Sequence, residues 1–260
     1  MPAGSGQSVI GSTPEGDGRG DAWVLAIEAS NPSAEPGGLA GTASVAGARL
    51  SGGSPVGDSM VEVRYEAGSR REDGLLPAIE RVRAGLGTPA PALSRVCVSV
   101  GPGGYTGLRV SVTVAKSLAF ATGAAVVAVP SASVASGGQP PEGPYAVALA
   151  SKGAFTHITR FASADDLVGE AIGVIGADGV VDALCGRGIR KLIADRFLPE
   201  PFRVSFEQAG GAVLAPRFSA VRCLEVGCSL RPTEPDALVP VYAREPEAVR
   251  LWRERRSPNA

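Results

Sequence analysis

The chain has 260 residues, 44% of them apolar, and a formal net charge of −1. This length can bury a sizeable core in one or two domains, and the balanced charge argues against a protein that binds nucleic acid through a basic surface of its own. A single histidine excludes a histidine-rich metal centre, so we expect no metal site.

Residues 1–21 are rich in Gly, Ser and Pro and contain no apolar block. This composition predicts a disordered leader rather than a signal peptide. No run of about 20 apolar residues follows, because Arg109 and Lys116 interrupt the best candidate. Four cysteines without Cys-x-x-Cys spacing indicate reduced thiols. We therefore expect a soluble cytoplasmic protein that does not contact membranes.

The first predicted strand, Trp23 to Ile27, ends in Glu28-Ala29-Ser30-Asn31. Ligand-facing groups of α/β proteins lie at the ends of such buried strands. Glu28 could therefore hold a metal ion or a phosphate-bound water, or it could be a solvated strand end. Residues 42–46 and 60–65 follow as a predicted antiparallel pair, because no helix signal separates them.

The next predicted helix covers Glu72 to Leu86. Its apolar residues recur at helical spacing, and Gly85 and Gly87 mark its end. A short β-branched strand, Val96 to Val100, then leads through a glycine-rich turn into a predicted helix from Leu108 to Thr122.

The helix from Leu108 to Thr122 is apolar almost all round. Its polar residues Arg109, Thr113 and Lys116 fall at i, i+4 and i+7, on one stripe. Such a helix must be covered on two sides, by its own sheet and by another helix or another protein.

The glycine-rich turn before this helix has two readings. Free N–H groups at a helix N-terminus attract anions, so the turn could contact a phosphate or nucleotide. It could equally be a tight structural turn, because it lacks both the Lys-Ser/Thr pair of a P-loop and the third glycine of the dinucleotide fingerprint. The candidate binding residues are Gly101, Gly103, Gly104, Thr106 and Gly107, with Glu28 nearby.

A second lobe is predicted after the Gly/Pro-rich stretch at 136–144, which follows a strand at 124–129. It begins with a hairpin at 145–149 and 154–161. The elements expected beyond the hairpin are helices at 164–172, 189–196, 217–226 and 246–255, and strands at 180–185 and 204–206. The order of elements suggests a duplicated actin-like layout, with lobes at 22–135 and 136–243 and a C-terminal helix and tail at 244–260.

Several motifs carry a family resemblance. Gly101-Pro102-Gly103-Gly104-Tyr105-Thr106-Gly107-Leu108-Arg109 resembles the Gly-Pro-Gly-Ser-Phe-Thr-Gly-Val-Arg motif of the TsaB family (YeaZ-type, Gcp-like proteins) of tRNA threonylcarbamoyladenosine biosynthesis. The opening strand with Glu28-Ala29-Ser30 is similar to the family's Leu-Ala-Ile-Asp-Thr-Ser start. Two further matches are Leu75-Leu76-Pro77 with its first-helix Leu-Pro, and Pro240-Val241-Tyr242-Ala243-Arg244 with its closing Pro-Val-Tyr-Leu-Arg.

The resemblance implies a two-lobed actin-like fold of the acetate-and-sugar-kinase (ASKHA, RNase H-like) type with mixed sheets. It implies a non-catalytic scaffold for TsaD, the catalytic paralogue that transfers threonylcarbamoyl to an adenosine beside the tRNA anticodon, with the ATPase TsaE as a further partner. No cofactor is then required, although ATP or ADP could bind at the complex with TsaD. The chain would interact with tRNA indirectly, through the complex. The chain alone could form a homodimer.

In the family, the helices at 72–86 and 108–122 pack against their counterparts in the partner. The interface residues that this implies are Leu75, Leu76, Ile79, Val82, Leu108, Arg109, Val112, Ala115, Lys116, Leu118 and Ala119. Charge on Val112 or Leu118 is then expected to abolish partner binding or the packing behind it.

The chain departs from the family at three places, each relevant to a nucleotide or metal site. Glu28 replaces the usual Asp, Arg71 stands where a His is expected, and Ser151-Lys152-Gly153 lacks a preceding Asp.

The alternative function is an ATP-binding enzyme of the sugar-kinase fold, in which Glu28 binds Mg²⁺ and the 101–107 loop binds phosphate. Such enzymes need several carboxylates around the metal. A protease is improbable, because His157 lies in a strand-like run.

Overall fold

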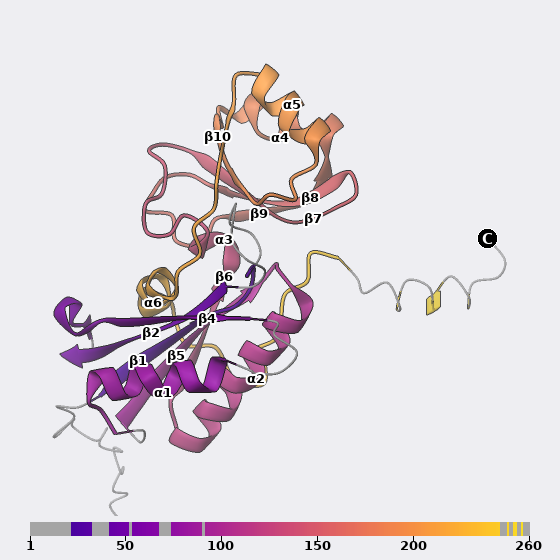
Figure 1. Ribbon diagram of the computed structural model, residues 1–260. Coiled ribbons are helices and arrows are strands. Elements are labelled where there is room, and N and C mark those ends of the chain that lie inside the picture. The colour runs from indigo at the N-terminus through magenta and orange to yellow at the C-terminus, as the bar shows by residue number, and fades with distance from the viewer. Residues whose placement is uncertain are drawn as a thin grey trace, which may run out of the picture.

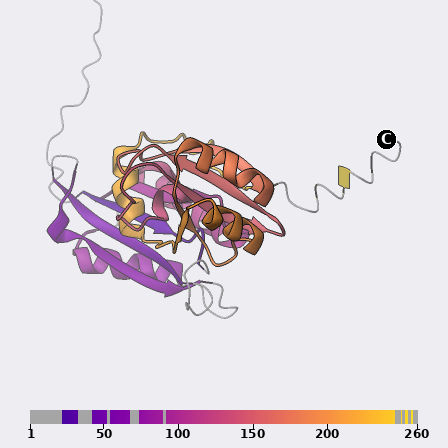
Figure 2. The ribbon, with the colours of Figure 1, turned by 90° about the horizontal axis from the view of Figure 1, so that it is seen from above.

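The computed structural model describes residues 22–32, 42–51, 54–67, 74–89 and 92–244, together with positions 249, 252, 253 and 256. The predicted leader at 1–21, the departure at Arg71 and most of the predicted helix at 246–255 lie outside the described residues. The chain forms two lobes, each built on one mixed sheet, and Figure 2 shows the second lobe over the first.

The first sheet contains β1 (Trp23–Glu28), β2 (Thr42–Ser51), β3 (Ser54–Pro55), β4 (Val61–Glu66), β5 (Leu93–Gly101) and β6 (Ala125–Pro130). Its order is β3-β2-β1-β5-β6, and β4 also pairs with β2. β1 is parallel to β5 and antiparallel to β2, while β2 and β4 form the predicted antiparallel pair. A short 3-10 helix, η1 (Gly57–Ser59), precedes β4.

Successive side chains of β1 point to opposite faces of the first sheet, so the core of the first lobe has two halves, one on each face. Leu25 and Ile27 face α1 (Leu75–Leu86) and α2 (Tyr105–Thr122), whereas Val24 and Ala26 face α6 (Ala220–Ser229). α1 and α2 cover one face of the sheet and α6 the other (Figure 1). Leu238 also packs into the first half, and Val241 N donates to the carbonyl of Val100 at 2.6 Å, so the closing segment returns to the first lobe.

The second sheet repeats the first. Its strands are β7 (Tyr145–Lys152), β8 (Phe155–Phe161), β9 (Glu170–Gly176), β10 (Lys191–Ala194) and β11 (Ala212–Leu214), in the order β11-β10-β7-β8-β9. β7 is antiparallel to β8 and parallel to β10, as β1 is to β2 and β5. This shared order confirms the predicted duplication, and the two mixed sheets with their helices have the actin-like arrangement.

Four predicted elements of the second lobe are wrong. The helix at 164–172 is replaced by a turn and β9, and Gly169, inside the predicted helix, has a φ of +71° that disfavours a helix. The strand at 180–185 is α4 (Val180–Ala183) with the 3-10 helices η3 (Ala177–Gly179) and η4 (Cys185–Arg187) on either side.

The other two errors also exchange a helix and a strand. The predicted helix at 189–196 contains β10, a short apolar run that is typical of a buried parallel strand. The predicted strand at 204–206 lies inside α5 (Glu200–Gln208), which buries Phe202 and Phe206 at i and i+4. In each of these short segments the packing of a few large side chains decided the structure.

The last helix of each lobe packs against the other lobe. α3 (Ser131–Val134) follows β6, and Ala132 with the adjacent Ala135 packs against Tyr145 and Phe161 of the second sheet. α6 follows β11 but buries Cys223 and Leu224 against the first sheet. The predicted boundary at 136–144 lies between the sheets, while α6, within the predicted second lobe, packs against the first.

The start of α6 is held by hydrogen bonds to the first sheet. Ser219 Oγ accepts from Val221 N at 3.1 Å and donates to Glu62 Oε1 at 2.9 Å, and Ala220 N donates to Ser44 Oγ. We expect Ser219→Ala to lower the free energy of unfolding by about 1 kcal/mol, the usual cost of removing an N-cap. Urea unfolding measures this. Ser229→Ala, at the other end of α6, is the control, and an equal loss there would contradict the capping role.

Candidate functional site

Glu28, at the end of β1, is a buried carboxylate surrounded by hydroxyl donors. Its Oε1 accepts from Ser30 N at 2.8 Å and from Ser30 Oγ at 2.6 Å, while Ser99 Oγ donates to Oε2. The side chain points to the α6 face, where Cys223 Sγ lies 3.8 Å from Ser99 Oγ. Glu28 is only 2% exposed, so the structure excludes the solvated strand end.

Burial raises the pKa of Glu28, and the hydrogen bonds from Ser30 and Ser99 offset part of that effect. Burial also raises the pKa of the neighbouring Cys223 thiol. Among the described residues, no ion pair includes Glu28. The carboxylate therefore lies in an environment that favours its protonated form, which is a poor metal ligand.

Glu28 should make stability depend on pH. Because its pKa is higher in the folded chain than the unfolded value of 4.5, its stabilising contribution is fully present below that pH. The contribution is lost as pH rises through the folded-state pKa. We expect the free energy of unfolding of the wild type to fall more between about pH 4.5 and about pH 8 than that of Glu28→Gln. Urea titrations measure this, with the exposed Glu142→Gln as control; parallel profiles for wild type and Glu28→Gln would contradict it.

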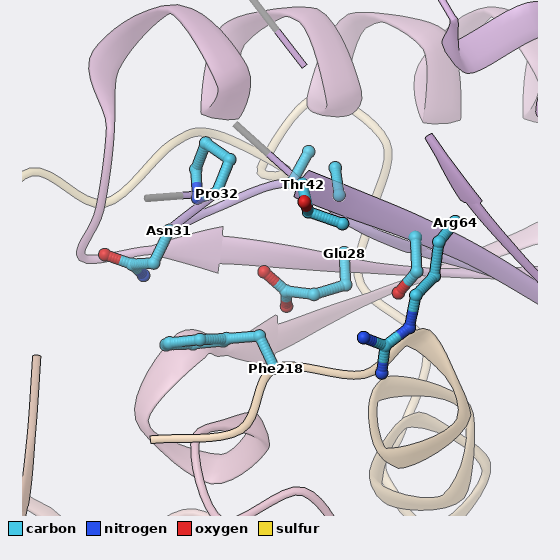
Figure 3. Close-up of a pocket in the computed structure, with 9 residues that line it drawn as sticks. Glu28, Asn31, Pro32, Thr42, Arg64 and Phe218 are labelled. Carbon is cyan, nitrogen blue, oxygen red and sulfur yellow. The ribbon is translucent and has the colours of Figure 1, made fainter. Parts of the chain in front are cut away.

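The cavity beside Glu28 is small. It has a volume of about 20 Å³ and is lined by Asn31, Thr42, Arg64 and Phe218, among others. Figure 3 shows the Phe218 ring and the Arg64 guanidinium on the same side of the carboxylate. This volume accommodates about one water molecule. Within the described structure, a nucleotide phosphate does not fit beside Glu28.

The glycine-rich turn packs against the chain's own backbone. A Cβ built on Gly103 would lie 2.1 Å from the carbonyl oxygen of Ser30, and one on Gly107 would lie 2.3 Å from that of Ala29. Gly101 has a φ of +113°, and its added Cβ would meet the carbonyl oxygen of Val241 at 2.2 Å. These close approaches favour the reading as a tight structural turn.

Only the outer part of the turn remains open. α2 begins at Tyr105, three residues earlier than predicted, and Gly104 is its N-cap. Thr106 therefore lies within the first turn of the helix, and no side chain caps the helix start. Gly104, Tyr105 and Thr106 are exposed. They line a surface cavity of about 420 Å³ between the starts of α1 and α2, together with Tyr65, Leu75 and Val110.

Most predicted interface residues lie inside the lobe. Seven of the eleven are buried: Leu75, Ile79, Val82, Leu108, Val112, Ala115 and Ala119. Leu118 is partly buried against the same core, and Lys116 Nζ donates to the carbonyl of Leu238 at 3.2 Å. Only Leu76 and Arg109 are exposed. Charge on Val112 would therefore disrupt the lobe's own core.

The outer face of α2 carries apolar residues that the sequence analysis missed. Phe120 is 95% exposed, Tyr105 51% and Val110 38%, while Leu76 on α1 is 57% exposed. Phe120 was detectable, because it continues the polar stripe of Arg109, Thr113 and Lys116 at i+11. The ring of Phe120 therefore stands in solvent on the polar stripe of α2.

Arg109 helps to fix the start of this face. Its guanidinium lies 5.1 Å from the centre of the Tyr105 ring and donates to the Tyr105 hydroxyl at 2.7 Å. Tyr105 in turn stacks on Tyr242 of the closing segment at 5.1 Å. The closing Pro-Val-Tyr motif therefore lies against the first turn of α2.

The remaining predictions concern His157, a metal site and membrane-spanning helices. His157 lies in β8, and burial lowers its pKa, as expected for a half-buried strand histidine. Within the described ranges, no group of three or more His, Cys, Asp or Glu residues could hold a metal ion. The helices there are also too short or too polar for any of them to cross a membrane.

Comparisons with known proteins concern the family and the fold. Residues 66–173 match the family model of TsaD, described as tRNA N6-adenosine threonylcarbamoyltransferase. A crystal structure of an uncharacterized protein with similarity to peptidase YEAZ from Pseudomonas aeruginosa is 17% identical with a TM-score of 0.62, covering 86% of this chain and all of that one. YeaZ from Pseudomonas aeruginosa is 16% identical with a TM-score of 0.59, covering 85% and 99%. No curated protein matches the sequence. The structural similarity establishes the fold.

Proposed function

From the TsaD family match and the YeaZ-like fold, which support assignment to the TsaB family, we propose that this chain is a non-catalytic scaffold in tRNA threonylcarbamoyladenosine synthesis. In this role it binds the catalytic paralogue TsaD, and the ATPase TsaE joins the complex. The family match supports a role in tRNA modification, and the surface of α1 and α2 supports the more specific role.

The observation that carries this proposal is the exposed apolar face of α1 and α2. Phe120 is 95% exposed, and Leu76 and Tyr105 are each more than half exposed. An exposed aromatic side chain contributes most when a partner removes it from water. A partner that packs helices of its own against α1 and α2 would cover this face, and TsaD, as a paralogue, has the corresponding helices.

The buried surroundings of Glu28 support a role without catalysis in this chain. Transfer chemistry needs an acid, base or metal that can reach a substrate. Glu28 is sealed beside a cavity of about 20 Å³, and His157 belongs to a strand of the second lobe. The chemistry is accordingly assigned to the partner.

The alternative, an ATP-binding enzyme, has one observation in its favour. The first turn of α2 faces the cavity of about 420 Å³ between the two helices. Calorimetry with Mg-ATP tests this alternative on the isolated chain. Heat of binding that disappears in a Thr106→Glu variant would favour the enzyme, whereas the scaffold requires no nucleotide on this chain alone.

Co-purification with TsaD from the same cell, followed by size-exclusion light scattering, tests the scaffold. We expect a one-to-one complex. A folded chain that stays apart from intact TsaD would overturn the proposed function. A homodimer of the isolated chain that dissociates on adding TsaD would support the same face, because both partners would then compete for α1 and α2.

A further inference from the structure

A second chemical cluster lies between β5 and α6, on the opposite face of the first sheet from α1 and α2 (Figure 1). Arg95 and Cys97 lie two residues apart on β5, so their side chains share one face of the sheet and both reach the last turn of α6. Arg95 Nη1 donates to the carbonyl of Cys228 at 3.1 Å, and the side chains of Cys97 and Cys228 interact. A Cβ built on Gly227 would lie 2.4 Å from Cys97 Sγ, so the missing side chain of Gly227 admits the thiol.

The two thiols differ in their access to solvent. Cys97 is completely buried, whereas Cys228 is partly exposed. Cys228 lines a surface cavity of about 380 Å³, together with Pro55, Met60 and Ser229. A small reagent can therefore reach Cys228 from solvent, whereas Cys97 is closed to it.

The surroundings also differ in their effect on ionisation. The hydrogen bond from Cys97 and the charge of Arg95 lower the pKa of Cys228 to about 7. The interaction with Cys228 and burial hold the pKa of Cys97 well above its usual value. Glu225 lines the same cavity, but its carboxylate lies 3.3 Å from Arg222. Cys228 is thus the nucleophilic member of the pair.

We propose that Cys228 is an oxidisable thiol that reacts with a hydroperoxide and then forms a disulfide with Cys97. The Cys228 thiolate attacks the peroxide, so that an S–O bond forms, the O–O bond breaks and an alcohol or water leaves. The Cys97 sulfur next attacks the sulfenic sulfur. An S–S bond forms, the S–O bond breaks, and the departing hydroxide takes the Cys97 proton to become water. Two thiols are oxidised and one peroxide is reduced.

This disulfide would tie the last turn of α6 to β5. β5 continues into the glycine-rich turn and α2, and α6 follows the segment that links the lobes. The oxidised form is therefore expected to resist unfolding more than the reduced form, because the cross-link closes a long loop in the unfolded chain. This inference does not depend on the proposed scaffold function.

Hydrogen peroxide treatment of the folded full-length chain tests the proposal, with intact mass and fragmented peptides as readouts. We expect a mass loss of two hydrogens and a Cys97–Cys228 cross-link. Cys185→Ser, the matched control in the second lobe, should keep the cross-link. Cys97→Ser should leave a sulfenic acid on Cys228 that dimedone traps, and Cys228→Ser should leave Cys97 reduced.

Alkylation of the wild type gives a measurement that does not depend on folding of the variants. At neutral pH we expect maleimide to modify Cys228 about tenfold faster than Cys185, because Cys97 and the charge of Arg95 favour the Cys228 thiolate. Equal rates, a cross-link that includes Cys223 instead, or a Cys97 that stays reduced while Cys228 is overoxidised would each overturn the proposal.

Discussion

Phe120→Glu is expected to weaken the complex with TsaD by about 30-fold or more without reducing the stability of the isolated chain. Phe120 is 95% exposed on α2, so a charge there disturbs nothing in the free protein. In a complex that covers α2, the same charge would lose its water without gaining a partner. Titration by calorimetry or interferometry gives the change in affinity, and thermal unfolding gives the stability.

The matched control is Phe197→Glu. Phe197 is also an exposed aromatic residue, at 53%, but it lies in the second lobe after β10. We expect this variant to bind TsaD as the wild type does. If both variants bind equally well, the outer face of α2 is not the interface, and the scaffold would have to bind through another surface.

Gly103→Ala is expected to destabilise the fold by at least about 2 kcal/mol. The added Cβ would lie 2.1 Å from the carbonyl oxygen of Ser30, and both groups belong to backbone that cannot move independently. Gly104 N donates to the same carbonyl at 2.6 Å, so any shift of Ser30 also breaks this hydrogen bond. Urea unfolding at neutral pH measures the loss.

Gly104→Ala separates the two readings of the turn. Its added Cβ would lie 3.6 Å from the Ser30 oxygen, an ordinary contact, and the backbone at Gly104 has φ −67° and ψ 125°, which alanine adopts readily. We expect almost unchanged stability and unchanged binding to TsaD. A variant that folds normally yet loses binding to Mg-ATP would instead indicate that the exposed end of the turn contacts phosphate.

The first lobe could be predicted well because its elements are long and carry clear patterns. The β-branched run at 96–100 and the apolar spacing of Leu75, Ile79 and Val82 specify a buried strand and a one-sided helix. Two of the elements of the second lobe that were predicted wrongly are very short. Lys191–Ala194 and Val180–Ala183 each have four residues, too few for either period to be recognised.

The candidate site was harder to predict because its partners are distant in sequence. Gly103 and Ser30 are separated by more than seventy positions, so the backbone contact that requires the glycine leaves no local pattern. The interface residues show a different limit. The apolar stripe that identified α1 as a helix is the stripe that packs on its own sheet, whereas a partner can contact only the opposite side.

The exchange of α3 and α6 between the lobes has a consequence for how the molecule comes apart. A half-molecule that ended near residue 140 would lack α6 and would leave Val24, Ala26 and Val127 of the first sheet in water. The remaining half would lack α3 beneath Tyr145 and Phe161. Neither half has a complete core, so limited proteolysis in the Gly/Pro-rich connection should release no stable fragment. Although the architecture is that of two lobes, denaturation is expected to follow a single cooperative transition.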